Sequence, residues 1–279
     1  MKTHALYPMM FHPLYKDFSW GGTTIARRYN RAHTPRPCAE SWELSALPGA
    51  ESLVANGPLE GIGLDVLAKT FGPALLGTKA PDPERFPLLV KLIDAHAPLS
   101  GPDAAPCEPQ ARELWYLLDA APGATLQAGS APDGTYQAFP ATPGDLFMLP
   151  AGTPRAIGPG NLLFLIRACL SPAADRALPP AEPFRAPLHT APHPHRDLQR
   201  HLSTPAFTFG TLSLTRTRTL HTTAQSFMLL FCAAGKTTLS HSGPHPLTLL
   251  PGDTVLVPPQ QALELHPLAP GTHLLLVTL

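Results

Sequence analysis

The chain contains 279 residues, 44% of them hydrophobic, which is enough apolar material for two compact domains or one large one. Its 20 Lys and Arg residues balance 20 Asp and Glu residues, and no basic cluster occurs, so the composition argues against nucleic acid as a partner. No apolar run approaches the roughly 18 residues of a membrane-spanning helix, so a membrane partner is not expected either.

The cysteines and the N-terminus indicate the compartment. Cys38, Cys107, Cys169 and Cys232 are isolated from one another, with no CxxC pair. This spacing favours reduced thiols over a disulfide framework or a zinc finger. The first four residues lack the apolar stretch of a signal peptide. Together these features predict a cytoplasmic protein.

The first half of the chain predicts mostly short strands. A short helix could begin at residue 24, and the best helix candidate is residues 63–71, where apolar positions recur with helical spacing. Residues 40–47 alternate between apolar and polar positions, as in a strand. Further strands are expected at residues 86–93, 113–119 and 137–150.

The second half predicts a regular β structure after a break. Residues 179–205 are rich in Pro and His and predict a linker. The strands that follow are expected at residues 207–216, 226–233, 236–241, 246–250, 254–258 and 274–279. Short strands at this spacing are typical of a barrel or sandwich.

A short frame occurs twice. Residues 143–150, PGDLFMLP, and residues 251–258, PGDTVLVP, each combine a Pro-Gly-Asp turn, four mostly apolar residues and a proline. The turn residues supply a tight bend and the apolar run a strand. We therefore predict a duplicated small β-barrel.

Several segments in order resemble the type I mannose-6-phosphate isomerases (phosphomannose isomerases) of the short bacterial kind, over most of residues 10–170. The segments are WGG at 20–22, ESWE at 40–43, VANG at 54–57, FPLLVKLIDA at 86–95, LS at 99–100, ELWYLLD at 113–119 and the run at 143–158. The resemblance implies a mainly β fold of two cupin-like (jelly-roll) barrels with a minor helical portion. It places an N-terminal isomerase domain at 1–178, the linker at 179–205 and a second barrel at 206–279.

The resemblance also implies a chemistry. Such enzymes interconvert mannose 6-phosphate and fructose 6-phosphate, and a zinc ion held by a Gln, two His and a Glu polarises the sugar oxygens. In this chain Pro102 and Ala104 stand where the family has Gln and His, and Arg155 stands at the second His. Only Glu113 of the four ligands remains. We therefore expect that zinc is not bound and that the activity is impaired or lost.

Other residues acquire roles through the same resemblance. We expect Lys91, Ser100 and Arg155 to bind a sugar phosphate. Lys91 interrupts an apolar strand. Arg176 is the candidate catalytic arginine, and Arg167 competes with it for that role. Because a buried lone carboxylate is costly, the Arg155 guanidinium could occupy the metal position and pair with Glu113.

Three alternatives remain open. The chain could be a divergent family member that still binds a sugar phosphate, or an active isomerase that is metal-free or rebuilds its metal site. His12, His96, Cys107 and Glu108 are the candidate substitute ligands. It could also be a non-catalytic scaffold. Trp20 and Trp115, like Ser41 and Glu43, are interpreted as packing or structural residues.

Overall fold

The computed structural model describes residues 5–31, 33–97, 111–130, 136–151, 153, 155–169, 197–243 and 245–279, and the backbone alone of 184–187, Ser130 and Tyr136. The chain forms two compact units. One comprises Pro13–Glu43 with Leu88–His189, and the other Met1–His12, Leu44–Pro87 and Thr190–Leu279. Each unit is described by itself.

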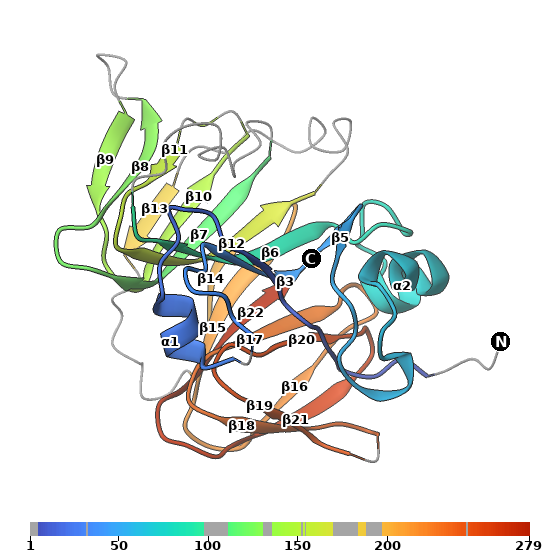
Figure 1. Cartoon of the computed structure of the whole chain (residues 1–279). Coiled ribbons are helices and arrows are strands. Elements are labelled where there is room, and N and C mark those ends of the chain that lie inside the picture. The colour runs from blue at the N-terminus through green and yellow to red at the C-terminus, as the bar shows by residue number, and fades with distance from the viewer. Residues whose placement is uncertain are drawn as a thin grey trace. The chain divides into compact units, whose positions relative to one another are not determined.

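The first unit is built on a seven-stranded antiparallel sheet (Figure 1). Its strands, in order across the sheet, are β13 (Phe184–Pro187), β10 (Asp145–Leu149), β7 (Glu113–Ala120), β12 (Asn161–Ala168), β6 (Leu88–Ala95), β3 (Glu40–Leu44) and β2 (Leu14–Lys16). A smaller sheet has the order β11 (Arg155–Ile157), β8 (Thr125–Ser130) and β9 (Tyr136–Pro140), and helix α1 spans Thr24–Tyr29.

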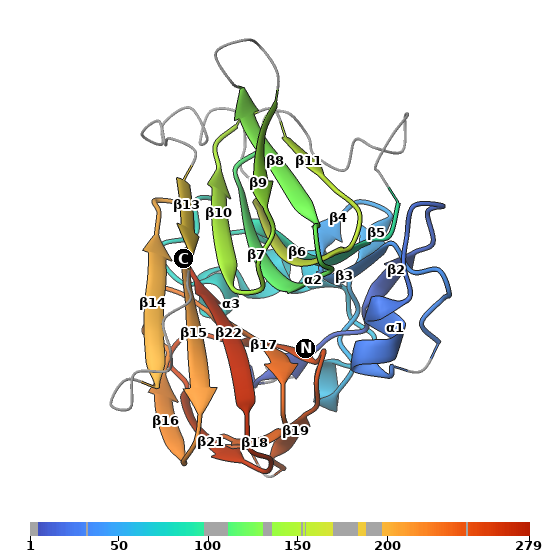
Figure 2. The ribbon, with the colours of Figure 1, turned by 90° about the vertical axis from the view of Figure 1, so that its left-hand side faces the viewer.

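The core of this unit lies between its two sheets. Trp115, Phe147 and Leu165 from the large sheet join Leu126 and Ile157 from the small one in a single buried cluster. Figure 2 shows β8, β9 and β11 as the layer in front of β7 and β10. Every residue of β12 is buried, so both faces of the central strand are covered. The unit is therefore a pair of facing sheets, the arrangement of a jelly roll.

The second unit repeats this plan. Its larger sheet has the order β1 (Met9–Met10), β20 (Thr254–Val257), β17 (Met228–Ala234), β22 (Thr272–Thr278), β15 (Thr208–Leu214) and β14 (Leu198–Ser203). The smaller has the order β16 (Arg218–His221), β21 (Ala262–Pro267), β18 (Thr237–Ser240) and β19 (Leu247–Leu249). Leu230 and Leu276 from the first sheet and Leu239 and Leu265 from the second share one core.

The remaining elements of the second unit come from the middle of the chain. They are β4 (Ala46–Leu47), β5 (Ala50–Glu51), the 3-10 turn η1 (Gly57–Leu59), α2 (Leu64–Phe71) and α3 (Pro73–Leu76). Helix α2 forms where predicted, and it buries Leu64, Leu67 and Ala68 on one face. Among the described residues, no helix is long and apolar enough to cross a membrane.

The duplicated frame folds in the same way in both units. Gly144 and Gly252 have φ of 91° and 93°, a conformation that glycine adopts without strain. Their amides donate to the carbonyls of Leu117 and Cys232 at 2.8 and 2.7 Å. Strands β10 and β20 follow these turns. The mainly β fold with a minor helical portion is thus confirmed.

The two units do not follow one another along the chain, because each is made of segments that are separated in the sequence. Residues 44–87 group with the C-terminal half, although they precede the isomerase-like strands. The segment predicted as a linker contains β13, which pairs with β10, and β14, which pairs with β15. Both lie at a sheet edge, where a strand needs only one partner and its sequence need not be strongly apolar. The division at residues 178 and 206 remains a prediction.

Candidate functional site

The strand register places several charged side chains on one face of the large sheet. Residues directly opposite each other in an antiparallel pair share a face. Arg167 on β12 is opposite Glu113 on β7, and Leu165 is opposite both Trp115 on β7 and Lys91 on β6. Because Trp115 and Leu165 belong to the core, all of these side chains are on the core-facing side.

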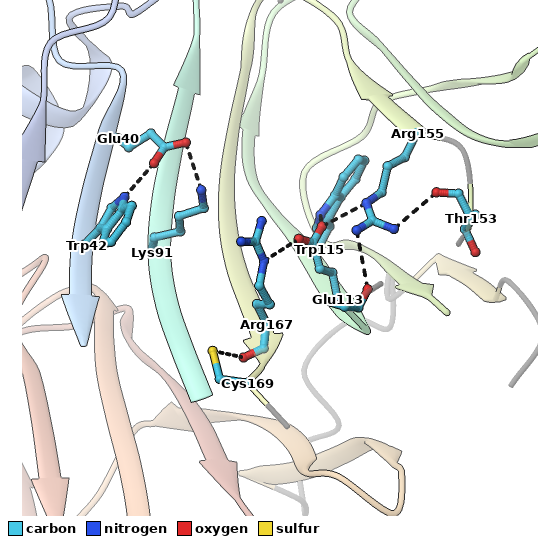
Figure 3. Close-up of polar contacts among 10 residues, drawn as sticks. Glu40, Trp42, Lys91, Glu113, Trp115, Thr153, Arg155, Arg167 and Cys169 are labelled. Atoms are coloured by element: carbon cyan, nitrogen blue, oxygen red, sulfur yellow. Dashed lines mark hydrogen bonds and ion pairs between the residues drawn. The ribbon is translucent and has the colours of Figure 1, made fainter. Parts of the chain in front are cut away.

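Glu113 is the centre of the first charged cluster, and it is fully buried. Its Oε1 accepts a hydrogen bond from Arg167 Nε at 2.8 Å, and its Oε2 accepts one from Trp115 Nε1 at 3.0 Å. The Nε atom of Arg155 lies 3.2 Å from the same Oε2 (Figure 3). The two guanidinium groups offset the cost of burying the carboxylate.

Arg155 is the first residue of β11, and its guanidinium contacts backbone carbonyls as well as the Glu113 carboxylate. Its Nη1 donates to the carbonyl of Thr153 at 3.1 Å, and its Nη2 to that of Ala111 at 3.4 Å. Its side chain is only 3% exposed. The sequence-based hypothesis that Arg155 pairs with Glu113 is confirmed, whereas its expected contact with substrate stays a prediction.

Arg167 has a partner that the sequence does not indicate. The family resemblance gives it only as a competitor of Arg176 for a catalytic position, and that role stays a prediction. In the structure Arg167 lies within β12 and donates to Glu113. The sequence does contain a signal that the Arg167 side chain faces the core, namely its spacing from neighbouring apolar residues. Arg167 follows the apolar run 162–166 at an even distance from Leu163 and Leu165, which places it on the same side of the strand as those core residues.

The residues of this cluster do not fit a zinc ion. Zinc requires deprotonated nitrogen, sulfur or oxygen ligands, three or more of them from the protein. Both oxygens of Glu113 already face N–H donors, and two of these donors belong to guanidinium groups that stay charged. Within the described residues, no group of three His, Cys, Asp or Glu side chains could hold a metal.

A second charged cluster surrounds Lys91. Its Nζ lies 2.8 Å from Glu40 Oε1, and both side chains are only 2% exposed. The other carboxylate oxygen of Glu40 accepts a hydrogen bond from Trp42 Nε1 at 2.5 Å. Lys91 Nζ also lies 5.7 Å from the centroid of the Trp42 ring, within cation–π range. Lys91 therefore faces inward among polar partners and does not extend into solvent.

Glu43 belongs to a separate, structural ion pair. It receives two hydrogen bonds from the Arg31 guanidinium, both at 2.9 Å, and a third from Ser41 Oγ at 2.7 Å. Burial opposes the charge of Arg31, but Glu43 outweighs it and raises the pKa of Arg31. This bidentate geometry anchors the segment before β3.

Asp94 caps helix α1 from the neighbouring strand. Its Oδ2 accepts hydrogen bonds from the backbone N–H groups of Thr24 at 2.5 Å and Ile25 at 3.1 Å. Any side chain at Gly22 would collide with this carboxylate, which explains one glycine of the Trp-Gly-Gly segment. Burial raises the pKa of Asp94, although the two amides act in the opposite direction.

Of the candidate substitute ligands, the two that the structure describes, His96 and His12, do not form a metal-binding group with Glu113. His96 is exposed in the turn after β6, and its charge acts on Asp94. His12 is exposed and belongs to the other unit. Ser100, Cys107, Glu108 and Arg176 lie outside the described residues. Trp20 and Trp115 are both buried in the core cluster, as expected for packing residues.

Comparison with known proteins agrees with the family resemblance of the sequence. Residues 9–116 match the family model described as "Phosphomannose isomerase type I, catalytic domain". The "Probable mannose-6-phosphate isomerase GmuF" of Bacillus subtilis is 31% identical over 186 residues, covering 58% of each chain. Mannose-6-phosphate isomerase ManA of the same organism is 29% identical over 180 residues. The matches thus span little more than half of the length of these curated relatives.

Solved structures show the fold over nearly the whole chain. The mannose 6-phosphate isomerase of Bacillus subtilis superposes with a TM-score of 0.75 at 20% identity, covering 98% of this chain and 99% of the other. A variant of phosphomannose isomerase from Salmonella typhimurium superposes with a TM-score of 0.72 at 17% identity, over 98% and 99%.

Proposed function

We propose that this chain, whose residues 9–116 belong to the type I phosphomannose isomerase family, binds a sugar phosphate but has impaired or lost isomerase activity. The observation that carries the proposal is the position of Glu113 between Arg155 and Arg167. The carboxylate that the family resemblance assigns to zinc is here the acceptor of a buried, charge-assisted network.

The proposed loss of the zinc-dependent reaction follows from the residues at the expected ligand positions. At the other expected ligand positions the sequence has Pro102, Ala104 and Arg155, none of which can coordinate zinc. A guanidinium cannot lose its proton in a protein, so Arg155 cannot become a ligand at any accessible pH. An isomerisation that depends on a Lewis acid therefore lacks its metal site.

Binding of an anionic sugar is supported by the charges on the same face of the sheet. Lys91 is inward-facing, in the strand that matches the family's FPLLVKLIDA segment. Ammonium groups in buried surroundings form strong hydrogen bonds with phosphate oxygens. Ser100, Arg155 and Arg176 remain the further candidates for substrate contact, Arg176 in the catalytic position.

The test combines turnover with binding. We expect metal-analysed protein to convert no mannose 6-phosphate to fructose 6-phosphate in a coupled assay, with or without added zinc. We expect mannose 6-phosphate to raise the midpoint of thermal unfolding, because a ligand that binds only the native state stabilises it by about 2.7 kcal/mol at 100 times its Kd. Mannose without phosphate is the matched control.

Each alternative has its own result. Zinc-dependent turnover would contradict the proposal and favour substitute ligands, with Cys107 and Glu108 the first to replace. Turnover that is unaffected by chelators would indicate a metal-free isomerase. The absence of both turnover and thermal stabilisation would leave the scaffold function.

A further inference from the structure

A second lysine lies next to the Lys91 cluster. Strands β2 and β3 pair so that Lys16 is directly opposite Glu40, and Leu14 is directly opposite Trp42. Directly opposite residues share a face, so Lys16 is on the same side of the sheet as Glu40. Glu40 contacts Lys91 of β6, the next strand of the sheet. Three neighbouring strands thus contribute Lys16, Glu40 and Lys91 to one corner.

Both ammonium groups lie near the same indole. Lys16 Nζ is 5.0 Å from the centroid of the Trp42 ring, and Lys91 Nζ is 5.7 Å from it. Lys16 and Trp42 are half-buried, whereas Lys91 and Glu40 are buried. The half-buried pair gives this corner a side that solvent reaches, which a ligand requires for entry.

The corner carries an excess of positive charge. Among the described residues, Glu40 is the one carboxylate that forms an ion pair with a lysine of this corner, so two ammonium groups share one negative charge. An ammonium has three N–H donors, and Glu40 accepts one from Lys91. At 2% exposure, the other donors of Lys91 have little access to bulk water. An anion that accepts from both lysines would satisfy these donors and balance the charge.

The cluster around Glu113 is less suited to binding an anion. There two guanidinium groups already hold a carboxylate, and the Arg155 side chain also donates to two backbone carbonyls.

The indole N–H of Trp42 donates to Glu40, so Trp42 can offer a ligand the face of its ring but not its N–H donor. The Trp42 face then forms an apolar wall beside the two ammonium groups.

We propose that Lys16, Trp42 and Lys91 form the subsite for the phosphate group of the sugar phosphate. The phosphate oxygens accept hydrogen bonds from Lys16 Nζ and Lys91 Nζ, and Glu40 holds the Lys91 ammonium beside the indole ring. The inference rests on the proposed function, since it names the part of the ligand that these residues recognise.

The experiment is isothermal titration calorimetry with mannose 6-phosphate, inorganic phosphate and mannose. The variants are Lys16→Met, Lys16→Arg and the control Lys69→Met, which removes a 65%-exposed lysine of α2. Because Lys16 is half-buried at the end of a short strand, we expect Lys16→Met to fold. We expect Lys16→Met to weaken both phosphate-containing probes about 10-fold, since it removes a charge-assisted hydrogen bond. We expect Lys16→Arg to keep most of the affinity and Lys69→Met to keep all of it.

The outcomes separate the subsite from the proposed function. If mannose 6-phosphate binds the Lys16→Met variant as tightly as the unmodified chain, the subsite is wrong and the proposed function stands. If inorganic phosphate binds in a Lys16-dependent way and mannose 6-phosphate does not bind, the lysine pair is a phosphate site and the proposed ligand is wrong. If neither probe binds the unmodified chain, both proposals are overturned.

The fluorescence of Trp42 gives a second measurement of binding, independent of calorimetry. The chain has three tryptophans, and Trp42 is the half-buried one, next to both ammonium groups. A phosphate that draws the ammonium groups away from the ring should change the intrinsic fluorescence. We expect the change to disappear in Trp42→Phe, which keeps an aromatic face. A change of equal size in that variant would contradict the location of the subsite.

Discussion

Arg167 and Glu113 are directly opposite each other on β12 and β7, and Arg167 Nε donates to Glu113 Oε1 at 2.8 Å. The Glu113 side chain is 0% exposed, so this carboxylate depends entirely on protein groups for its solvation. Arg155 and Trp115 complete its surroundings. A residue that the family resemblance assigns to a metal has become part of an internal ion-pair network.

Replacing Arg167 should destabilise the fold substantially. We expect Arg167→Met to lower the free energy of unfolding by about 3 kcal/mol, because removing one partner leaves a buried charge undercompensated. Urea denaturation measures the change. The control is Arg28→Met, which breaks the exposed pair between Arg28 and Asp119 at 3.4 Å and should cost less than about 1 kcal/mol. Equal effects of the two substitutions would contradict a stabilising role for the network.

The pair between Lys91 and Glu40 should behave as a coupled unit. Each single variant, Lys91→Met and Glu40→Gln, leaves one partner charged and buried, so each should cost about 3 kcal/mol or more. The double variant leaves no unpaired charge and should cost less than the sum of the two. A double-mutant cycle from urea denaturation measures this coupling. Additive losses would show that the two side chains do not interact energetically.

Asp94 should give the unfolding free energy a distinct pH dependence. Its pKa is raised by burial above the ordinary 3.8, so the folded chain binds its proton more tightly than the unfolded chain does. The stability from this group is therefore fully present below pH 3.8 and is lost as pH rises through the folded pKa.

The comparison for this prediction is Asp94→Asn, which keeps an oxygen acceptor for the two amides of α1 but does not titrate. We expect the unmodified chain to lose stability relative to Asp94→Asn as the pH rises above 3.8 and through the raised pKa of Asp94. Urea denaturation at several pH values measures the difference. A difference that is constant with pH would mean that the pKa of Asp94 is not raised.

Restoring one family ligand should not restore the reaction. We expect Arg155→His to show no zinc-dependent conversion of mannose 6-phosphate, because Pro102 and Ala104 still stand at two other ligand positions and Arg167 still holds Glu113. The coupled assay with added zinc measures this, and zinc content per chain is the accompanying control. Turnover in the single variant would overturn the assignment of the ligand positions.

The sequence alone predicted much of the local structure. The two Pro-Gly-Asp frames became matching turns followed by β10 and β20, and the apolar periodicity of residues 63–71 became α2. These features succeed because turn chemistry and side-chain periodicity act over a few neighbouring residues. Residue identity alone also shows that Pro102, Ala104 and Arg155 stand where the family resemblance places metal ligands.

The tertiary structure decided which of those residues meet. Arg167 lies 54 residues from Glu113 in the chain, and Lys91 lies 51 from Glu40. Local pattern indicates which face of a strand is buried, but it cannot indicate which residue of a distant strand is opposite. That depends on register, and a shift by one residue would move every side chain to the other face. The sequence therefore identified Lys91, Glu113, Arg155 and Arg167 as candidates, and only strand pairing added Lys16 and placed Arg167 opposite Glu113.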